Sequence, residues 1–155
     1  MEELSIRRIR EDEWDTAMEL AFRVFLKFEA EEYGKKGTEA FAQFVTDTNL
    51  KKAFVGGQYH LFAAYIEDRI IGVTALRSGN HLSLLFVDGA YHRQGVGSRL
   101  LGYAENYLRD NTAFKKITVN AAPYAYGFYH TLGFRDTDGQ SVKDGIVYTP
   151  MEKMI

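Results

Sequence analysis

The sequence predicts an α/β protein in which a mixed central sheet of about seven strands is layered with four helices. Three observations lead to this prediction. The apolar run 82–87 is too short for a helix and is apolar on both faces, as expected of a strand buried inside a sheet. A glycine-containing turn follows, and the segment 98–110 repeats apolar residues at spacings of three and four, the pattern of an amphipathic helix. The segments 59–66 and 70–76 flank a polar turn as the two strands of a hairpin would.

The part of the chain before this hairpin is expected to hold one strand and two helices. We predict a strand at 4–9 and a long helix at 11–32 with Asp12 as its N-cap. The segment 33–37 ends that helix, and Thr38 caps the next one. The long helix is apolar on a second side as well as on its core face, so it contacts a second helix or lines a pocket.

The last third of the chain predicts a strand, a short helix and a final pair of strands. The strand covers 116–121. Pro123 stands at a favourable early position of the short helix, and Gly133 stands at its C-cap. The segments 134–143 and 145–155 are expected to form a hairpin or two separate strands. Helices alternating with strands in this order indicate a layered α/β arrangement.

Length and composition exclude several classes of protein. A chain of 155 residues can bury a full core, and we expect one domain, 1–155. The formal net charge of -2 argues against nucleic-acid binding. The absence of cysteine excludes disulfides and thiolate catalysis, and no histidine has a second ligand at metal-binding spacing, so no metal site is expected. With no signal peptide and no apolar run of membrane-spanning length, we expect a cytoplasmic protein that does not bind a membrane.

The turn between the buried strand and the helix at 98–110 has the features of an anion-binding loop. It reads His92-Arg93-Gln94-Gly95-Val96-Gly97. The first N–H groups of a helix lack internal partners and carry the positive end of its dipole, and glycines let a phosphate approach the backbone. The sequence therefore predicts a pyrophosphate site. The Rossmann and Walker A patterns both fail here, and a plain connection would need neither the second glycine nor the adjacent Arg and Gln.

Two motifs resemble those of the GNAT N-acetyltransferases. The segment 92–97 resembles their motif A, [RQ]-x-x-G-x-[GA], with His92 in place of Arg or Gln. The segment 120–134 is similar to their pattern N-A-x-x-x-A-x-x-F-Y-x-x-L-G-F. The predicted order of strands and helices is also that of the GNAT fold, so the resemblance spans nearly the whole chain.

The resemblance implies acetyl-CoA as the cofactor. In that family the fourth and fifth strands splay apart, and the pantetheine lies in the gap and pairs with the fourth strand. A bulge near Phe86 or Val87 could also free an N–H group for the acyl oxygen. The residues expected to hold acetyl-CoA are Phe86, Val87, His92, Arg93, Gln94, Gly95, Val96, Gly97, Ser98 and Asn120.

The chemistry implied is acetyl transfer to a primary amine of a small molecule or a peptide, by direct attack on the thioester. Tyr129, at the family's tyrosine position near the cofactor sulfur, is expected to be the general acid for the departing thiolate. No carboxylate stands in 82–87 to serve as the base. Candidates elsewhere are Glu29, Glu31, Glu32 and His81, or a water chain, and the sequence does not choose among them.

The acceptor is less defined than the cofactor. Glu29 and Glu32, in an acidic stretch, are expected to attract a cationic amine. Dimers are common among the proteins it resembles, so a homodimer is one expected state. The alternative function is a catalytically silent acyl-CoA-binding regulatory module, which would share the glycine turn but would need neither Tyr129 nor an acceptor pocket.

Overall fold

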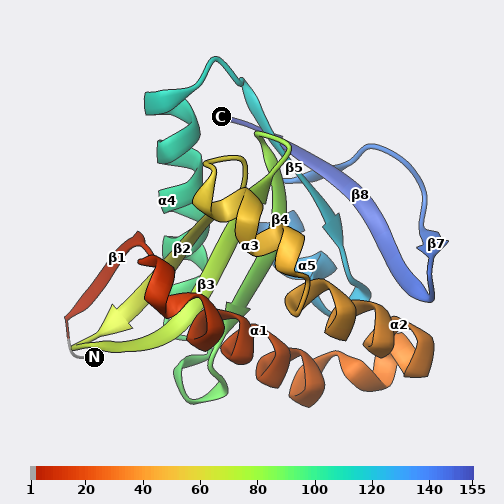
Figure 1. The fold of residues 1–155 in the computed structure, drawn as a ribbon. Helices are drawn as coiled ribbons and strands as arrows, with labels where there is room; N and C mark the ends of the chain where they lie inside the picture. The colour runs from red at the N-terminus through yellow and green to blue at the C-terminus, as the bar shows by residue number, and fades with distance from the viewer. Residues whose placement is uncertain (1–2) are drawn as a thin grey trace.

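The computed structural model describes residues 3–155 and forms a layered α/β structure (Figure 1). The strands are β1 (Leu4–Arg8), β2 (His60–Ile66), β3 (Arg69–Arg77), β4 (His81–Val87), β5 (Lys116–Ala121), β6 (Arg135–Asp136), β7 (Ser141–Lys143) and β8 (Ile146–Met154). The helices are α1 (Trp14–Phe28), α2 (Ala30–Val45), α3 (Thr48–Val55), α4 (Val96–Asn111) and α5 (Pro123–Thr131). Short 3₁₀ turns occur at Glu11–Glu13 and Gly89–Tyr91.

The sheet is mixed, as predicted. Its order is β1-β2-β3-β4-β5-β8-β6, with β7 pairing β8 outside this path. The β4–β5 pair is parallel and the other pairs are antiparallel. Within residues 3–155 there are eight strands and five α-helices, where the sequence predicted about seven and four. The additional helix is α3, and the additional strand arises because the segment 134–143 is divided into β6 and β7.

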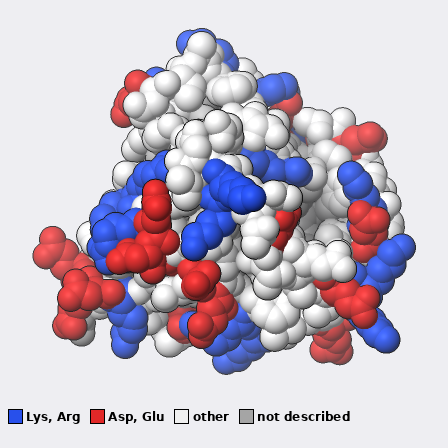
Figure 2. Space-filling view, in the orientation of Figure 1, with Lys and Arg blue, Asp and Glu red and all other residues white. Residues whose placement is uncertain are grey.

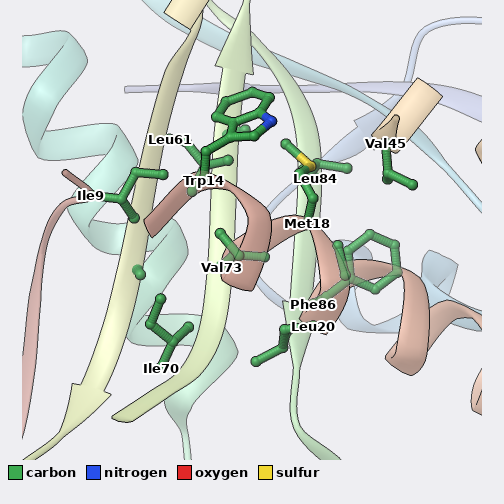
Figure 3. Packing of buried hydrophobic residues seen from close by; sticks show 14 of the residues in the cluster. Ile9, Trp14, Met18, Leu20, Val45, Leu61, Ile70, Val73, Leu84 and Phe86 are labelled. Atoms are coloured by element: carbon green, nitrogen blue, oxygen red, sulfur yellow. The ribbon is translucent and has the colours of Figure 1, made fainter. Parts of the chain in front are cut away.

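Helices cover both faces of the sheet, and buried side chains fill the space between the sheet and the helices on each face. Helix α1 packs on one face of the central strands and α4 on the other (Figure 1). Figure 3 shows Trp14, Met18 and Leu20 of α1 lying over the sheet, near Leu84 and Phe86 of β4. The core face predicted for α1 is therefore confirmed. Its second apolar side contacts α2, where the rings of Phe22 and Phe41 stack with centroids 6.3 Å apart.

The first helical region differs from the prediction of one helix over 11–32. Helix α1 ends at Phe28, and α2 begins at Ala30 and continues through Gly34, whose φ of 72° marks a kink. The backbone at Gly34 is not helical, so α2 consists of two helical pieces joined at this glycine, and the break predicted within 33–37 is present there. Asp12 is also not the N-cap. Glu13 stands at the N-cap position of α1 without a side-chain cap bond, and its carboxylate instead accepts from the Arg10 N–H at 2.8 Å, at the start of the preceding 3₁₀ turn.

Strand β4 pairs with β5 only through its first two residues, and the two strands then separate. The paired residues are His81 with Thr118 and Leu82 with Val119. The β3–β4 register shifts next to this point, so that Ser83 is an extra residue, a β-bulge. The predicted bulge near Phe86 or Val87 is thus wrong in position. A bulge bends its strand, so the one at Ser83 accounts for the divergence of β4 from β5.

No helix among residues 3–155 is long and apolar enough to cross a membrane.

Candidate active site

The gap between β4 and β5 exposes one edge of β4. Neighbouring residues of a strand direct their backbone groups to opposite edges. The Leu84 carbonyl accepts from a threonine hydroxyl of β3 at 2.9 Å, and the Asp88 N–H donates to a β3 carbonyl at 2.8 Å. The backbone groups of Leu85 and Val87 therefore face the gap. Phe86 directs its backbone to β3, so Leu85 takes the position that sequence reasoning gave to Phe86.

The loop after β4 ends in a helix N-terminus with free backbone donors. Gly95, with φ of 80°, is the N-cap of α4, and Arg93 also has a positive φ, 63°. The Arg99 N–H donates to the Gly95 carbonyl at 3.1 Å, the first backbone bond of the helix. The N–H groups of residues 96–98 accordingly have no acceptor within the helix. These free donors stand at the positive end of the helix dipole, which suits an anion.

His92 holds this loop to β4. Its Nε2 lies 2.6 Å from the Val87 carbonyl oxygen, and because a carbonyl can only accept, Nε2 carries the hydrogen. The ring also packs on Phe28 of α1, with centroids 4.6 Å apart. This anchoring explains how a histidine can stand where motif A usually has Arg or Gln.

Two cavities flank the gap. The first, here the α4 cavity, has a volume of about 720 Å³ and lies between the N-terminus of α4, the end of β4 and α5; its lining includes Val87, Arg93, Gly97, Tyr124 and Phe128. The second, here the α2 cavity, has a volume of about 390 Å³ and lies between α2, β4 and β5; its lining includes Phe41, Phe44, Arg77, His81 and Ile146. Figure 2 shows the surface hollowed between the side formed by α3 and the side formed by β8.

The two cavities meet at a small set of shared residues. These are Glu29, Leu85, Phe86, Ala125 and Tyr129. A molecule in the α4 cavity and another in the α2 cavity would therefore touch at this point. Among the shared residues only Glu29 and Tyr129 have side chains that can exchange a proton.

Tyr129 is buried, and its hydroxyl has no protein partner among residues 3–155. The side chain is 6% exposed, and its ring lies edge-on to Phe128 and Phe134 with centroids 5.3 Å from each. Burial, and then the charge of Glu29, raises the pKa of Tyr129 above its ordinary value. The hydroxyl therefore stays protonated and can donate. The hydroxyls of five other tyrosines do have partners: Tyr59 with Ser83, Tyr65 with Glu13, Tyr91 with Arg69, Tyr107 with His60, and Tyr126 with Asp136.

Glu29 is a buried carboxylate at the junction of α1 and α2. It is 9% exposed, and burial together with repulsion from Glu32 raises its pKa to about 7, while hydrogen bonding with the Tyr33 hydroxyl opposes the shift. A carboxyl group with this pKa changes its protonation near neutral pH. It is therefore suited to take up and release a proton.

The other residues predicted for the site are distributed differently. Asn120 lines the α2 cavity rather than the α4 cavity. The Gln94 side chain bonds back to the Ala90 carbonyl at 3.3 Å. Glu32 lines neither cavity, and its Oε1 accepts from the Tyr124 N–H at 3.1 Å, at the start of α5. Glu29 thus lies where the two cavities meet, whereas Glu32 links α2 to α5.

Sequence reasoning missed the lining of the α2 cavity. Phe41, Phe44 and Arg77 were not among the predicted site residues, and Tyr33 was placed only in the segment that ends the first helix. Their signal was weak, because each belongs to an element that the sequence could not place against β4.

The sequence matches the family model for the acetyltransferase (GNAT) domain over residues 29–155. This chain belongs to the GNAT acetyltransferase family. The resemblance carried by the motifs at 92–97 and 120–134 is therefore confirmed. As a member of this family the chain is an acetyl-CoA-dependent N-acetyltransferase.

Solved structures of similar fold agree with this assignment. A GCN5-related N-acetyltransferase from Rhodopseudomonas palustris matches with a TM-score of 0.85 and 20% identity, over 100% of this chain and 98% of that one. PaiA N-acetyltransferase from Thermoplasma acidophilum, solved in complex with coenzyme A, matches with a TM-score of 0.82 and 18% identity over 99% of each chain. YjaB from Escherichia coli, in its apo form, matches with a TM-score of 0.70 and 26% identity, over 98% of this chain and 97% of that one.

The α4 cavity of this GNAT enzyme fits the cofactor. The unpaired amides of residues 96–98 can take up the pyrophosphate oxygens. Arg93, which lines the cavity, has no ion-pair partner among residues 3–155 and can add a positive charge. The gap-facing backbone of Leu85 and the N–H group of Val87 can pair with the amide groups of the pantetheine.

Proposed function

We propose that this GNAT enzyme acetylates a primary amine of a small molecule or a peptide by direct attack on the thioester, with Tyr129 as general acid. The observation that supports this most is the meeting of the two cavities at Tyr129 and Glu29. Direct transfer requires that donor and acceptor occupy separate spaces and touch at one point, and the two cavities provide that arrangement.

In this proposal acetyl-CoA occupies the α4 cavity. The pyrophosphate lies on the amides after Gly95, and the pantetheine runs along β4 toward Tyr129. The contacting residues are those expected from the sequence that line this cavity, with Leu85 added: Leu85, Phe86, Val87, His92, Arg93, Gly95, Val96, Gly97 and Ser98. Gln94, whose side chain bonds back to Ala90, and Asn120, which lines the α2 cavity, are not among them. A gap-facing N–H group, of Val87 or Leu85, is placed to stabilise the negative charge that grows on the acyl oxygen.

The acceptor amine occupies the α2 cavity beside Glu29. An alkylammonium has a pKa near 10.4 and must lose a proton before it can attack. Glu29 has the burial, the position and the pKa to accept that proton, so it both attracts the cation and acts as the base. Glu32 contributes by repelling Glu29 and thereby raising its pKa, and by holding α2 against α5.

The reaction then balances between these two side chains. Glu29 first takes one proton from the ammonium and passes it to solvent. The amine nitrogen then bonds to the acetyl carbon, and the carbon–sulfur bond breaks. The departing sulfur takes a proton from Tyr129, and Glu29 takes the second proton that the nitrogen loses as the amide forms. Net transfer of one proton from Glu29 to Tyr129, directly or through water, restores both groups. The charge of Glu29 contributes to the raised pKa of Tyr129, so the two groups interact electrostatically.

A panel of acceptors with acetyl-CoA tests the proposal, with CoA-thiol release as the measurement. Primary amines and amino-terminal peptides should be acetylated. Alcohols of the same shape should not, because they carry no cation for Glu29 to bind and deprotonate. Release of thiol with alcohols alone, or hydrolysis that no amine accelerates, would contradict the proposal.

The α2 cavity also bears on the alternative function. A catalytically silent acyl-CoA-binding module needs a cofactor cavity but no second cavity that meets it at a proton donor. The presence of the α2 cavity therefore favours catalysis. We further propose that the enzyme acts in the cytoplasm as one domain, 1–155.

A further inference from the structure

Most arginines of this chain have a hydrogen-bond or ion-pair partner within the protein, and two do not. The sequence contains ten, and eight have a side-chain hydrogen bond or ion pair: Arg7, Arg8, Arg10, Arg23, Arg69, Arg99, Arg109 and Arg135. Within residues 3–155, Arg77 and Arg93 have none. Arg93 lines the α4 cavity and Arg77 lines the α2 cavity. An arginine without a protein partner at a cavity wall is available for an anion of the ligand.

The surroundings of Arg77 leave it as the one cation at its end of the α2 cavity. It ends β3 and is in register with His81 of β4. Burial, and then the charge of Arg77, lowers the pKa of His81 to about 4, so this histidine is neutral at pH 7 and bonds to the Thr118 hydroxyl at 2.8 Å. Ser83 adds a hydroxyl, held 2.9 Å from that of Tyr59. One guanidinium with neutral hydrogen-bonding groups around it is a site for a carboxylate.

The opposite end and the walls of the cavity define the rest of the ligand. Glu29 and Tyr129 lie at the end that meets the α4 cavity, where the amine must be. Phe25, Phe41, Phe44 and Ile146 supply apolar walls in between. The distance between the amine site and the Arg77 guanidinium follows from the length of β4. His81, beside Arg77, and Phe86, at the amine site, are five residue steps of ~3.3 Å apart. The long Arg77 side chain reaches back along the cavity, which reduces the distance to the order of 10 Å.

From this arrangement we propose that Arg77 forms a carboxylate subsite, and that the natural acceptor is an amine with a carboxylate about 10 Å away across an apolar segment. An extended tripeptide with apolar side chains has these dimensions, since each residue adds about 3.3–3.6 Å. This inference rests on the proposed amine acetylation and names its substrate class. Asp144, on the turn between β7 and β8, is the remaining charged residue of the wall, and it would favour a cation instead.

Three acceptors of equal length separate these alternatives: 8-aminooctanoate, octylamine and 1,8-diaminooctane, whose far ends are anionic, neutral and cationic. Arg77→Gln should raise the KM for 8-aminooctanoate by tenfold or more, the range for a hydrogen bond to a charged group. It should leave the KM for octylamine unchanged and lower that for the diamine. Arg77→Lys keeps the charge and should lose only part of the effect. Arg10→Gln, which removes an arginine that pairs with Asp12 and Glu13 outside both cavities, is the matched control and should change none of the three.

Other results would overturn the subsite. An equal change for all three acceptors would mean that Arg77 only supports the fold. A wild-type preference for the diamine that Asp144→Asn removes would assign the far end to a cation. Turnover of other amines but none of these three would overturn the subsite while leaving amine acetylation intact. Failure of every amine would instead overturn the proposed function itself.

Discussion

Gly37 of α2 and Gly145 of the turn between β7 and β8 touch backbone to backbone. A Cβ on Gly145 would lie 2.9 Å from the Gly37 nitrogen, and a Cβ on Gly37 would lie 3.2 Å from the Gly145 oxygen. Gly145 also has a φ of 80°, which other residues rarely adopt. The contact joins two walls of the α2 cavity, because Ala40 follows on one side and Ile146 on the other. The acceptor site thus depends on two glycines that lie far apart in the sequence.

Gly37→Ala should loosen this wall. The added methyl would meet Tyr33 Cβ at 2.9 Å as well as Gly145, and overpacking of this kind costs about 1–3 kcal/mol. We expect a lower Tm and a severalfold higher KM for the acceptor, with the KM for acetyl-CoA unchanged. Gly102→Ala is the control, since a Cβ there meets nothing within 4 Å inside α4 and should stabilise the fold by about 0.5–1 kcal/mol. An unchanged acceptor KM in a destabilised Gly37→Ala variant would remove the contact from the site.

Gly97→Glu should weaken acetyl-CoA binding severely, by a hundredfold or more. The side chain would place a negative charge at the start of α4, where the pyrophosphate is expected. Gly97→Ala provides the comparison. Its Cβ would lie at an ordinary 3.4 Å from Phe128 Cζ, so the fold should be retained and affinity should fall only modestly. Titration calorimetry measures both. Equal affinities for the Glu and Ala variants would show that the anion binds elsewhere.

Local patterns were sufficient for much of the fold and of the cofactor loop. The strand 116–121 was predicted with its observed bounds, and the glycine turn at 92–97 leads directly into α4. In both cases the signal lies in neighbouring residues, as apolar alternation or as glycines between a strand and a helix. The helix 48–55 was missed because only Phe54 is buried in it, which leaves a weak apolar pattern.

The acceptor site could not be predicted in the same way, because it is made by packing between distant elements. Glu29 was expected to attract a cationic amine as part of an acidic stretch, but its burial could not be foreseen, because it arises where α1 meets α2. The bulge at Ser83 has no local sequence signal and is visible only in the register of β3 against β4. Arg77 is a candidate ligand-binding residue only because it lines the cavity that α2 closes. The residues next to it in the sequence do not indicate that cavity.

The raised pKa of Glu29 predicts opposite effects on activity and stability. As the base, its carboxyl group must be ionised, so kcat/KM should rise with pH to a plateau above an apparent pKa of about 7. Glu29→Gln should lose this dependence and most of the turnover. The folded carboxyl pKa is raised, so its stabilising contribution is complete below pH 4.5 and is lost as pH rises through about 7.

The stability side of this prediction is measurable by itself. The difference between pKa values of 4.5 and about 7 corresponds to about 3 kcal/mol. Glu29→Gln should therefore be more stable than the wild type at pH 8 and similar to it at pH 4, by urea denaturation. A purely structural residue would lose stability on substitution, and a substrate-binding residue that is not the base would raise KM but keep the pH dependence of kcat.

Tyr129→Phe isolates the proposed general acid, since phenylalanine keeps the ring and removes only the hydroxyl. The hydroxyl has no protein partner among residues 3–155, so its loss leaves no buried group unpaired, and the contacts with Phe128 and Phe134 remain. The fold and the affinity for acetyl-CoA should be retained. If the hydroxyl protonates the departing thiolate, kcat should fall by about 10²-fold, the lower end for a general acid, because a thiolate is already a fair leaving group. Tyr126→Phe is the control on the same helix, since its exposed hydroxyl bonds to Asp136 and touches neither cavity. Steady-state rates on one accepted amine decide the question: a folded Tyr129→Phe enzyme with wild-type turnover would leave Tyr129 as a packing residue and make solvent the source of the proton.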